Sequence, residues 1–364
     1  MKTVDYNQFN QIIAFANQQF SGDYQVDFIK IQPKIYHHPE RFAHHHYIYE
    51  EQNQIVGLIG TYPLEYQGLK LLGIGTVCVN RNYRNQGIMQ KMFAYLDDVQ
   101  KQYDIIYLSG DKTRYEHFGF YKTGKYVKYR LKFNAFKSKN YDVMNIQSYL
   151  HESQDVNQNL YQLYLDNSKG ISRNADIFYD ILKTNQAEVY LLANLQGYLV
   201  YHPKRKLIAE LVIDSSKLET AIYNFMKYKN LQEVYYELSI DDERVNSIYQ
   251  ISEENYLVTM MNFKIINYIN VIKSVLRKKK RIKRGKLVIE IDSKVKLMIE
   301  VNSCVNVQEV FDEKVDLSLS SKEMHSLLLD DFTFFYPHFD KKVDLIKSWF
   351  PLYLPVTLHS IDSI

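Results

Sequence analysis

Residues Val77–Met92, VCVNRNYRNQGIMQKM, run from an apolar segment through a polar bend into a segment with helical spacing. The run that ends at the bend, 71–79, has the apolar composition of a buried strand. From Ile88 onward, apolar residues recur at spacings of one, three and four, which is typical of one helix face. A single glycine, Gly87, stands where that helix should begin. The stretch therefore predicts a strand, a bend and a helix, in this order.

The position of Gly87 indicates an anion site. A helix N-terminus offers free backbone N–H groups and the positive end of the helix dipole, and both attract anions. Glycine has no side chain to keep a phosphate away, and Arg84 adds a charged hydrogen-bond donor. The strand backbone at 77–79 can pair with an amide-bearing arm of a ligand. The pattern favours a pyrophosphate with a peptide-like tail, although glycine before a helix is also a common cap or turn.

The surrounding sequence predicts an α/β (α+β) fold. Residues 47–56, YIYEEQNQIV, read as a hairpin, 104–109 as a buried strand and 111–117 as a short helix. A second segment repeats this theme without a glycine bend. Its predicted helices and strands are 156–166, 175–184, 188–193, 197–201 and 208–213.

A basic run, 276–286, separates these segments from the C-terminal part. Beyond it, residues 287–291, 296–301 and 314–319 are predicted as short antiparallel strands, followed by a helix over 322–329. With a boundary inside the basic run, the predicted domains are 1–140, 141–275 and 285–364.

Composition narrows the function classes. The 364 residues contain 45 Lys and Arg against 42 Asp and Glu, a net charge of +3, which is unlike a dedicated nucleic-acid binder. Cys78 and Cys304 form no CxxC pair, so neither a disulfide framework nor a zinc site is indicated. The N-terminus is polar, and no run approaches the roughly 18 apolar residues of a membrane span. We expect a cytoplasmic protein.

The residues around Gly87 resemble the acetyl-CoA loop of GNAT N-acetyltransferases, R/Q-x-x-G-x-G/A after a strand. Met89 departs from that pattern, and a bulky residue there is usual in the enhanced-intracellular-survival branch. Residues 108–120, LSGDKTRYEHFGF, are similar to the second family signature, Y-x-x-x-G-F/Y. The resemblance continues through 168–173 and 197–201. In that branch, tandem GNAT-like mixed sheets flanked by helices precede a sterol-carrier-like domain.

The resemblance implies acetyl-CoA as donor and a homo-oligomer, and no metal is expected. The implied cofactor contacts are Val77, Cys78, Val79, Arg84, Asn85, Gln86, Gly87, Ile88, Met89, Ser109 and Gly110. Whether the third domain holds a lipid stays open.

The histidines and the basic run each allow a second interpretation. His44 and His46 would share one strand face, but a metal would need a third ligand, with only His37 and His38 near. Contact with the acceptor is favoured, because this segment precedes the strand that walls the acceptor cleft in GNAT folds. Residues 277–284 have no interleaved aromatic residues for base stacking, so a solvated linker is favoured over a specific nucleic-acid site.

Acetyl transfer to an amine needs a proton acceptor for the amine, whose pKa is about 10, and a donor for the leaving thiolate. Tyr115 matches the family's general acid. In the enhanced-intracellular-survival branch, the chain's terminal carboxylate, here that of Ile364, folds back as the base. The polar end of this chain, 359–364, also fits a frayed tail, in which case Asp111, Glu116 or a water chain would serve.

We therefore expect an acetyl-CoA-dependent N-acetyltransferase. The resemblance allows an aminoglycoside, a polyamine-like molecule or a lysine side chain as the amine acceptor. A non-catalytic acetyl-CoA sensor or scaffold would keep the loop without needing Tyr115. A peptidoglycan aminoacyltransferase also pairs two GNAT folds but uses aminoacyl-tRNA, and the loop at 84–89 argues against it.

Overall fold

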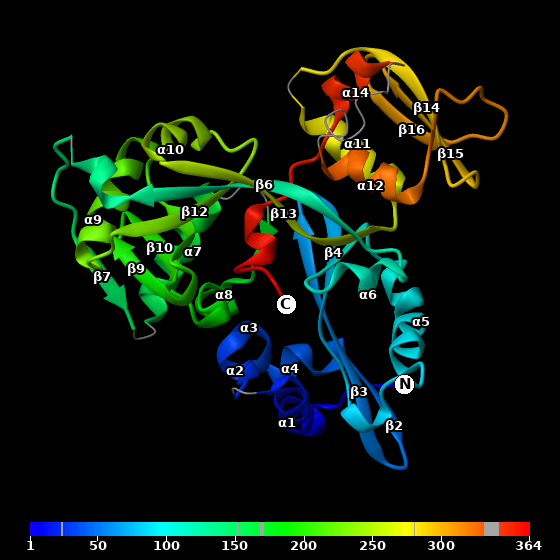
Figure 1. Cartoon of the computed structure of the whole chain (residues 1–364), viewed down its shortest axis with the longest axis horizontal. Helices are drawn as coiled ribbons and strands as arrows, with labels where there is room; N and C mark the ends of the chain where they lie inside the picture. Colours follow the sequence, from blue (N-terminus) through cyan, green and yellow to red (C-terminus); the bar gives the residue numbers. More distant parts are fainter. Residues whose placement is uncertain (23–24, 138, 151–152, 168–170, 280, 331–341) are drawn as a thin grey trace.

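The computed structural model describes residues 1–22, 25–137, 139–150, 153–167, 171–279, 281–330 and 342–364. Its two sheets contain 13 and four strands within these ranges. The large sheet runs through both halves of the first 265 residues, and the small sheet belongs to the C-terminal part (Figure 1). The fold is a mixed α/β fold with helices against large mixed sheets, as the sequence predicts.

The first half builds the strand, bend and helix around Gly87. Its main elements are β1 (Lys2–Thr3), α1 (Phe9–Phe20), α2 (Phe28–Ile31), α3 (Pro33–Tyr36), α4 (Pro39–Phe42), β2 (His46–Glu51), β3 (Gln54–Tyr66), β4 (Leu69–Val79), α5 (Ile88–Gln100), β5 (Ile105–Leu108), α6 (Lys112–Glu116) and β6 (Tyr121–Lys132). The hairpin between β2 and β3 turns at Gln52 and Asn53, which both have positive φ. The predicted hairpin, strand and helix are confirmed.

Helices cover the two faces of this half. The apolar face of α5, with Ile88, Met92 and Leu96, is buried in a cluster with Val56 and Ile74 of the sheet. Helices α1 to α4 belong to a different cluster, on the side of the sheet to which Cys78 points.

The second half repeats the element order. It contains β7 (Ile146–Tyr149), α7 (Gln154–Asn167), β8 (Ile171–Ser172), α8 (Phe178–Leu182), β9 (Glu188–Leu192), β10 (Gly197–His202), β11 (Leu207–Val212), α9 (Leu218–Tyr228), β12 (Glu233–Ser239), α10 (Val245–Ile251) and β13 (Glu254–Ile265). The order from β9 to β13 matches that from β2 to β6. Tandem GNAT-like sheets account for this repeat.

The two halves exchange their last strands. β6 pairs with β12 of the second half on one side, and β13 pairs with β5 of the first half. β6 and β13 also pair with each other, so the central order is β4-β5-β13-β6-β12-β11. The predicted limit between residues 140 and 141 therefore separates two segments of chain that share one continuous sheet.

The C-terminal part forms the four-stranded sheet, in the order β16-β15-β14-β17. Its elements are α11 (Tyr268–Lys278), β14 (Gly285–Ile291), β15 (Val295–Val301), β16 (Val305–Glu309), β17 (Leu317–Leu319), α12 (Ser321–Leu329) and α14 (Val343–Trp349). β17 pairs with β14 in parallel, so the antiparallel expectation is wrong for this strand, because the chain crosses over to the far side of β14. The predicted limit at residue 275 falls inside α11, which packs on β16.

Short 3-10 helices connect many of these elements: η1 (Tyr6–Gln8), η2 (Ala43–His45), η3 (Arg81–Tyr83), η4 (Phe133–Phe136), η5 (Ala175–Ile177), η6 (Thr184–Gln186), η7 (Pro203–Arg205), η8 (Ser215–Lys217) and η9 (Val356–His359). After α14, the chain returns from the C-terminal part and ends between the two halves of the large sheet (Figure 1, red). In the described ranges, no helix has the length and apolar character needed to cross a membrane.

Candidate active site

A fork opens between β4 and β5. The two strands pair in parallel from Leu71↔Ile105 to Ile74↔Leu108, and no further pair joins them in the described part of the chain. β4 continues beyond Ile74 with β3 as its partner, as far as Val79. Between the pairs Gly60↔Gly75 and Leu58↔Cys78, β4 has one residue more than β3, and Thr76 has a φ of 53°. Such a bulge bends the strand and re-aims its end.

The predicted acetyl-CoA loop lies at the mouth of this fork. Gly87 is the N-cap of α5 with a φ of 72°, a conformation that favours glycine. A Cβ built on Gly87 would meet no atom closer than 3.8 Å, so the space beside the first turn of the helix is open. Arg84 is exposed, and its Nε donates to the Val79 carbonyl at 3.4 Å. These features fit a phosphate that reaches backbone N–H groups.

The remaining predicted contacts lie on both sides of the fork. Val77, Val79 and Met89 are half-buried near α5, Ile88 is buried, and Asn85 and Gln86 are exposed in the loop. Ser109 and Gly110 are exposed just beyond the end of β5. Cys78 is buried on the opposite face, and burial raises the pKa of its thiol to about 12. Cys78 therefore contributes backbone to the fork, not a reactive thiolate.

Tyr115 is held against the end of β5. It lies in α6, is 6% exposed, and packs against Phe93 and Phe120 with ring centroids 6.1 and 6.4 Å away. A Cβ on Gly110 would overlap the Tyr115 ring, so only glycine fits there. Burial raises the pKa of Tyr115, which keeps the phenol protonated and able to donate at neutral pH.

The C-terminus lies against β4 at the same fork. A Cβ on Gly75 would lie 2.7 Å from the carboxylate carbon of Ile364, and a Cβ on Gly73 would lie 2.8 Å from its Cγ2. The absence of side chains at these two positions makes room for the last residue. Ile361 and Asp362 are at most 1% exposed. The frayed tail that the polar sequence allowed is therefore wrong.

Residues of the first half hold the backbone of the tail. The Nζ of Lys34 donates to the carbonyls of Ile361 and Ser363 at 2.6 and 2.5 Å, and the Tyr107 hydroxyl donates to the Asp362 carbonyl at 3.1 Å. Complete burial lowers the pKa of Lys34 to about 7, although the nearby Asp362 carboxylate opposes this shift. Each hydrogen bond satisfies a buried carbonyl that would otherwise cost about 1–3 kcal/mol.

The second half holds the tail by its side chain. Arg173 donates from Nε and Nη2 to the Asp362 carboxylate at 3.0 and 2.9 Å, and from both Nη atoms to Glu210. The Tyr198 hydroxyl donates to Glu210 at 2.5 Å. Arg173 ends the motif 168–173, of which residues 168–170 lie outside the described ranges. In the sequence, Arg173 is a single arginine after a short polar stretch, and nothing there indicates that it binds the C-terminal tail.

Three other residues near the fork escaped the sequence prediction. Tyr36 and Thr76 share a buried hydrogen bond of 2.7 Å between their hydroxyls, which fixes the bulge of β4 against α3. Asn262 of β13 is 1% exposed and donates from Nδ2 to the Gly110 carbonyl at 3.0 Å. Both contacts join segments far apart in the sequence, so no local spacing reveals them.

The histidines differ from their predicted arrangement. His44 and His45 lie in η2, and β2 begins only at His46, so His44 and His46 do not share a strand face. His46 is fully buried, and its Nδ1 lies 2.8 Å from the Phe42 carbonyl. His37 and His38 contact Asp180 of the second half instead. Within the described ranges, no group of three His, Cys, Asp or Glu side chains could hold a metal ion.

The other candidate bases are engaged elsewhere. Asp111 caps α6 by accepting from the Arg114 N–H at 3.0 Å, and Glu116 accepts from Lys322 at 3.0 Å.

The basic run is divided between the end of α11 and the connection to β14, where Lys283 pairs with Asp344 at 2.9 Å. Lys280 in that run lies outside the described ranges.

A family model matches the part of the chain that contains this fork. Residues 43–122, which contain β4, the loop and Tyr115, match the model described as "Acetyltransferase (GNAT) domain". This part of the chain is a GNAT acetyltransferase domain. The chain therefore carries the domain of an N-acetyltransferase.

Solved structures share the fold over almost the whole chain. A GCN5-related N-acetyltransferase from Anabaena variabilis has a TM-score of 0.71 at 14% identity, with 97% of this chain and 96% of that chain covered. Eis1 from Mycobacterium abscessus has a TM-score of 0.67 at 10% identity, covering 95% and 94%. A probable N-acyltransferase from Enterococcus faecalis has a TM-score of 0.67 at 14% identity, covering 94% and 93%. At these identities, the likeness shows the fold.

A comparison with curated proteins finds no match to this chain. The sterol-carrier-like interpretation of the C-terminal part remains a prediction.

Proposed function

We propose that the chain transfers an acetyl group from acetyl-CoA to a primary amine at the fork between β4 and β5. The single observation that carries the proposal is the position of three groups around this fork: the open N-terminus of α5 at Gly87, the buried phenol of Tyr115 and the terminal carboxylate of Ile364. The GNAT domain match supports the same reaction.

Each part of the donor has a matching feature. The backbone N–H groups that follow Gly87, with Arg84 beside them, suit a pyrophosphate. The edge of β4 beyond Ile74 suits the amide groups of pantetheine, because it has no strand partner on the side of β5 in the described ranges. The fork then directs the thioester inward, between Tyr115 and the tail.

In the proposed reaction, groups at the site account for each bond that forms or breaks and for each proton that moves. The neutral amine nitrogen attacks the thioester carbonyl carbon, a C–N bond forms, and the C–S bond breaks. The Tyr115 hydroxyl donates its proton to the leaving thiolate, whose basicity is comparable to that of phenol. The amine proton passes to the Ile364 carboxylate, directly or through one water molecule.

The test is a thiol-release assay on the full chain with saturating acetyl-CoA and a panel of amines: an aminoglycoside, a polyamine and a lysine peptide. We expect amine-dependent release of CoA and an acetylated product by mass spectrometry. Binding of acetyl-CoA without release for any amine would favour a sensor or scaffold. Failure to bind acetyl-CoA would overturn the proposal.

A second experiment addresses Ile364. A few residues added after Ile364 replace the terminal carboxylate by a neutral peptide bond, while the same residues added before Met1 leave it intact. We expect kcat/KM to fall only in the C-terminally extended chain. Equal values for several amines would remove Ile364 from the mechanism and leave a water chain or another carboxylate as the base.

A further inference from the structure

The second half contains its own fork, at the equivalent place. β11 and β12 pair in parallel only at Leu207↔Tyr235 and Ile208↔Tyr236, among the described residues. β11 carries one extra residue, Ala209, against β10, as β4 does against β3. The repeat of the element order therefore extends to the bulge and to the strand separation.

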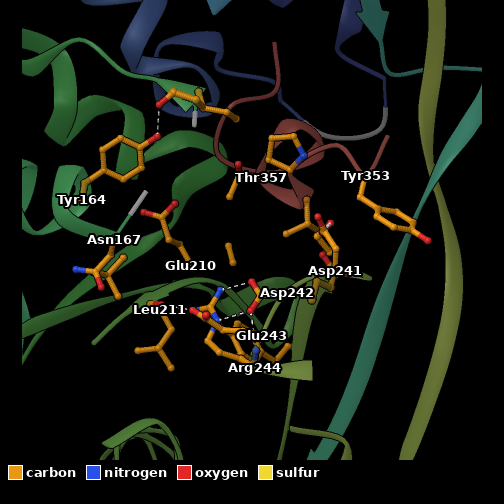
Figure 2. A pocket seen from close by; sticks show the side chains of 18 of the residues that line it. Tyr164, Asn167, Glu210, Leu211, Asp241, Asp242, Glu243, Arg244, Tyr353 and Thr357 are labelled. Carbon is orange, nitrogen blue, oxygen red and sulfur yellow. Dashed lines mark hydrogen bonds and ion pairs between the residues drawn. The ribbon is translucent and has the colours of Figure 1, made fainter. Parts of the chain in front are cut away.

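A cavity of about 760 Å³ lies at this second fork. Its wall comes from the ends of β11 and β12, from α7, from the turn after β3 and from the C-terminal segment at Tyr353 and Thr357 (Figure 2). This volume is in the range of small-molecule sites. Arg173 and Glu210 line it as well, so the ion pairs that hold the tail form part of the wall.

The second fork is unsuited to a pyrophosphate. Between β11 and α9 the chain makes only the short η8, without a glycine loop. The Asp214 carboxylate accepts from the Ser216 N–H at 2.9 Å, whereas the corresponding cap in the first half is the neutral side chain of Asn80. The Asp214 carboxylate thus already accepts from the N–H group that an anionic ligand would need, and its negative charge would repel such a ligand.

The charge of the wall points to a cation. Two guanidinium groups, those of Arg173 and Arg244, line the cavity together with six carboxylates. The carboxylates are those of Glu210, Asp214, Glu237, Asp241, Asp242 and Glu243. Arg244 is bound to Asp242, as Figure 2 shows. Further side chains reach two of the carboxylates from outside the wall. Lys128 and Arg205 approach Glu237, the His359 Nε2 lies 3.0 Å from the same carboxylate, and Lys279 lies near Asp241. Within the wall itself, six carboxylates face two guanidinium groups.

An unsatisfied hydroxyl in the wall gives an independent sign of a ligand. Tyr236 is 1% exposed and lines the cavity, and its hydroxyl has no hydrogen-bond partner among the described residues. Burying a hydroxyl without a partner is costly, so such groups are normally paired. A ligand that fills the cavity would supply the partner.

We propose that this cavity is a binding site for a linear aliphatic polyamine, separate from the acetyl-transfer fork. The ammonium groups would pair with the carboxylates, and the methylene chain would pack on the rings of Tyr164 and Tyr353. A nitrogen of the ligand would bond the Tyr236 hydroxyl. This site goes beyond the proposed function, because it needs neither acetyl-CoA nor the loop at Gly87.

The experiment measures spermidine binding to the full chain by calorimetry, without acetyl-CoA. We expect Asp241→Asn/Glu243→Gln to weaken binding at this site at least tenfold. Glu309→Gln/Asp312→Asn removes the same charge from exposed positions of the C-terminal part and should keep the wild-type affinity. No binding of spermidine, or an equal loss in both double variants, would overturn the proposal.

Tyr236→Phe provides the second arm. If the hydroxyl bonds a ligand, spermidine affinity should fall about three- to tenfold while the Tm of the ligand-free chain stays equal or rises. Unchanged affinity with a lower Tm would assign the hydroxyl a structural role and overturn the site. Displacement of spermidine by MgCl2 beyond that by NaCl of equal ionic strength would indicate a divalent cation instead. Binding without acetylation of any amine would leave this site standing and overturn only the proposed function.

Discussion

Arg173 and Asp362 form a buried, two-point ion pair that joins the second half of the chain to its C-terminus. The Nε and Nη2 atoms of Arg173 lie 3.0 and 2.9 Å from the two carboxylate oxygens, and both side chains are 1% exposed. Asp362 stands two residues before the terminal carboxylate that lies on Gly75 in the first half. The position of Ile364 at the first fork therefore depends on a contact made in the second half.

Asp362→Ala should release the tail. The substitution leaves the buried charge of Arg173 with Glu210 as its remaining carboxylate partner, and breaking a buried pair typically costs about 3–5 kcal/mol. We expect that loss in the free energy of unfolding by urea denaturation, with faster removal of Ile364 by a carboxypeptidase. Asp344→Ala serves as control, because Asp344 is exposed and its pair with Lys283 lies on the surface, where such pairs contribute about 0–1 kcal/mol. Equal digestion rates in both variants would contradict the docking.

Gly75→Ala should displace the end of the tail without changing the backbone conformation. The new Cβ would lie 2.6 Å from Cγ1 of Ile364, and overpacking of this kind costs about 1–3 kcal/mol. We expect lower stability and lower kcat in the full chain. In a chain that lacks Ile364, the same substitution should cost little, because its main clash is gone. A double-mutant cycle measures this coupling, and additive losses would mean that Gly75 and Ile364 are not in contact in solution.

Gly87→Asp should abolish acetyl-CoA binding, because it places a side chain and a negative charge beside the expected pyrophosphate. Gly68→Asp is the matched control. Both glycines have positive φ, 72° and 80°, and both have open space around them, so the backbone strain is comparable. Calorimetry should find binding to the Gly68 variant and none to the Gly87 variant. Wild-type affinity in a folded Gly87→Asp chain would place the donor elsewhere.

Tyr115→Phe should lower kcat by about 10²–10⁴-fold with nearly unchanged acetyl-CoA affinity, since the ring still packs and only the proton donor is lost. Tyr103→Phe removes the hydroxyl of a half-buried tyrosine in the same cluster and should keep the wild-type rate. Because burial raises the pKa of Tyr115, the loss of activity from its ionisation should appear only above pH 10. A wild-type rate in the folded Phe variant, with chemistry rate-limiting, would make Tyr115 structural.

The elements that sequence patterns predicted best are those with local causes. The spacing of Ile88, Met92 and Leu96 on one helix face and the turn at Gln52 and Asn53 appear where the sequence places them. Gly87 has the positive φ that its position before the helix indicated. The prediction that His44 and His46 share a strand face is wrong. Alternate residues share a face only within a strand, and the strand begins at His46.

By itself, the sequence determined the order of strands and helices, the loop at Gly87 and the residues on either side of it, because hydrophobic periodicity and glycine conformation act over a few residues. Only the tertiary structure decided the rest. Three features join residues more than a hundred positions apart: the exchange of β6 and β13, the ion pair between Arg173 and Asp362, and the hydrogen bonds from Lys34 to the last carbonyls. Their physical cause is the pairing of buried charges and backbone groups, which have no partner until the chain has folded. The polar end of the chain is for this reason buried at the fork, although its composition resembles that of a free tail.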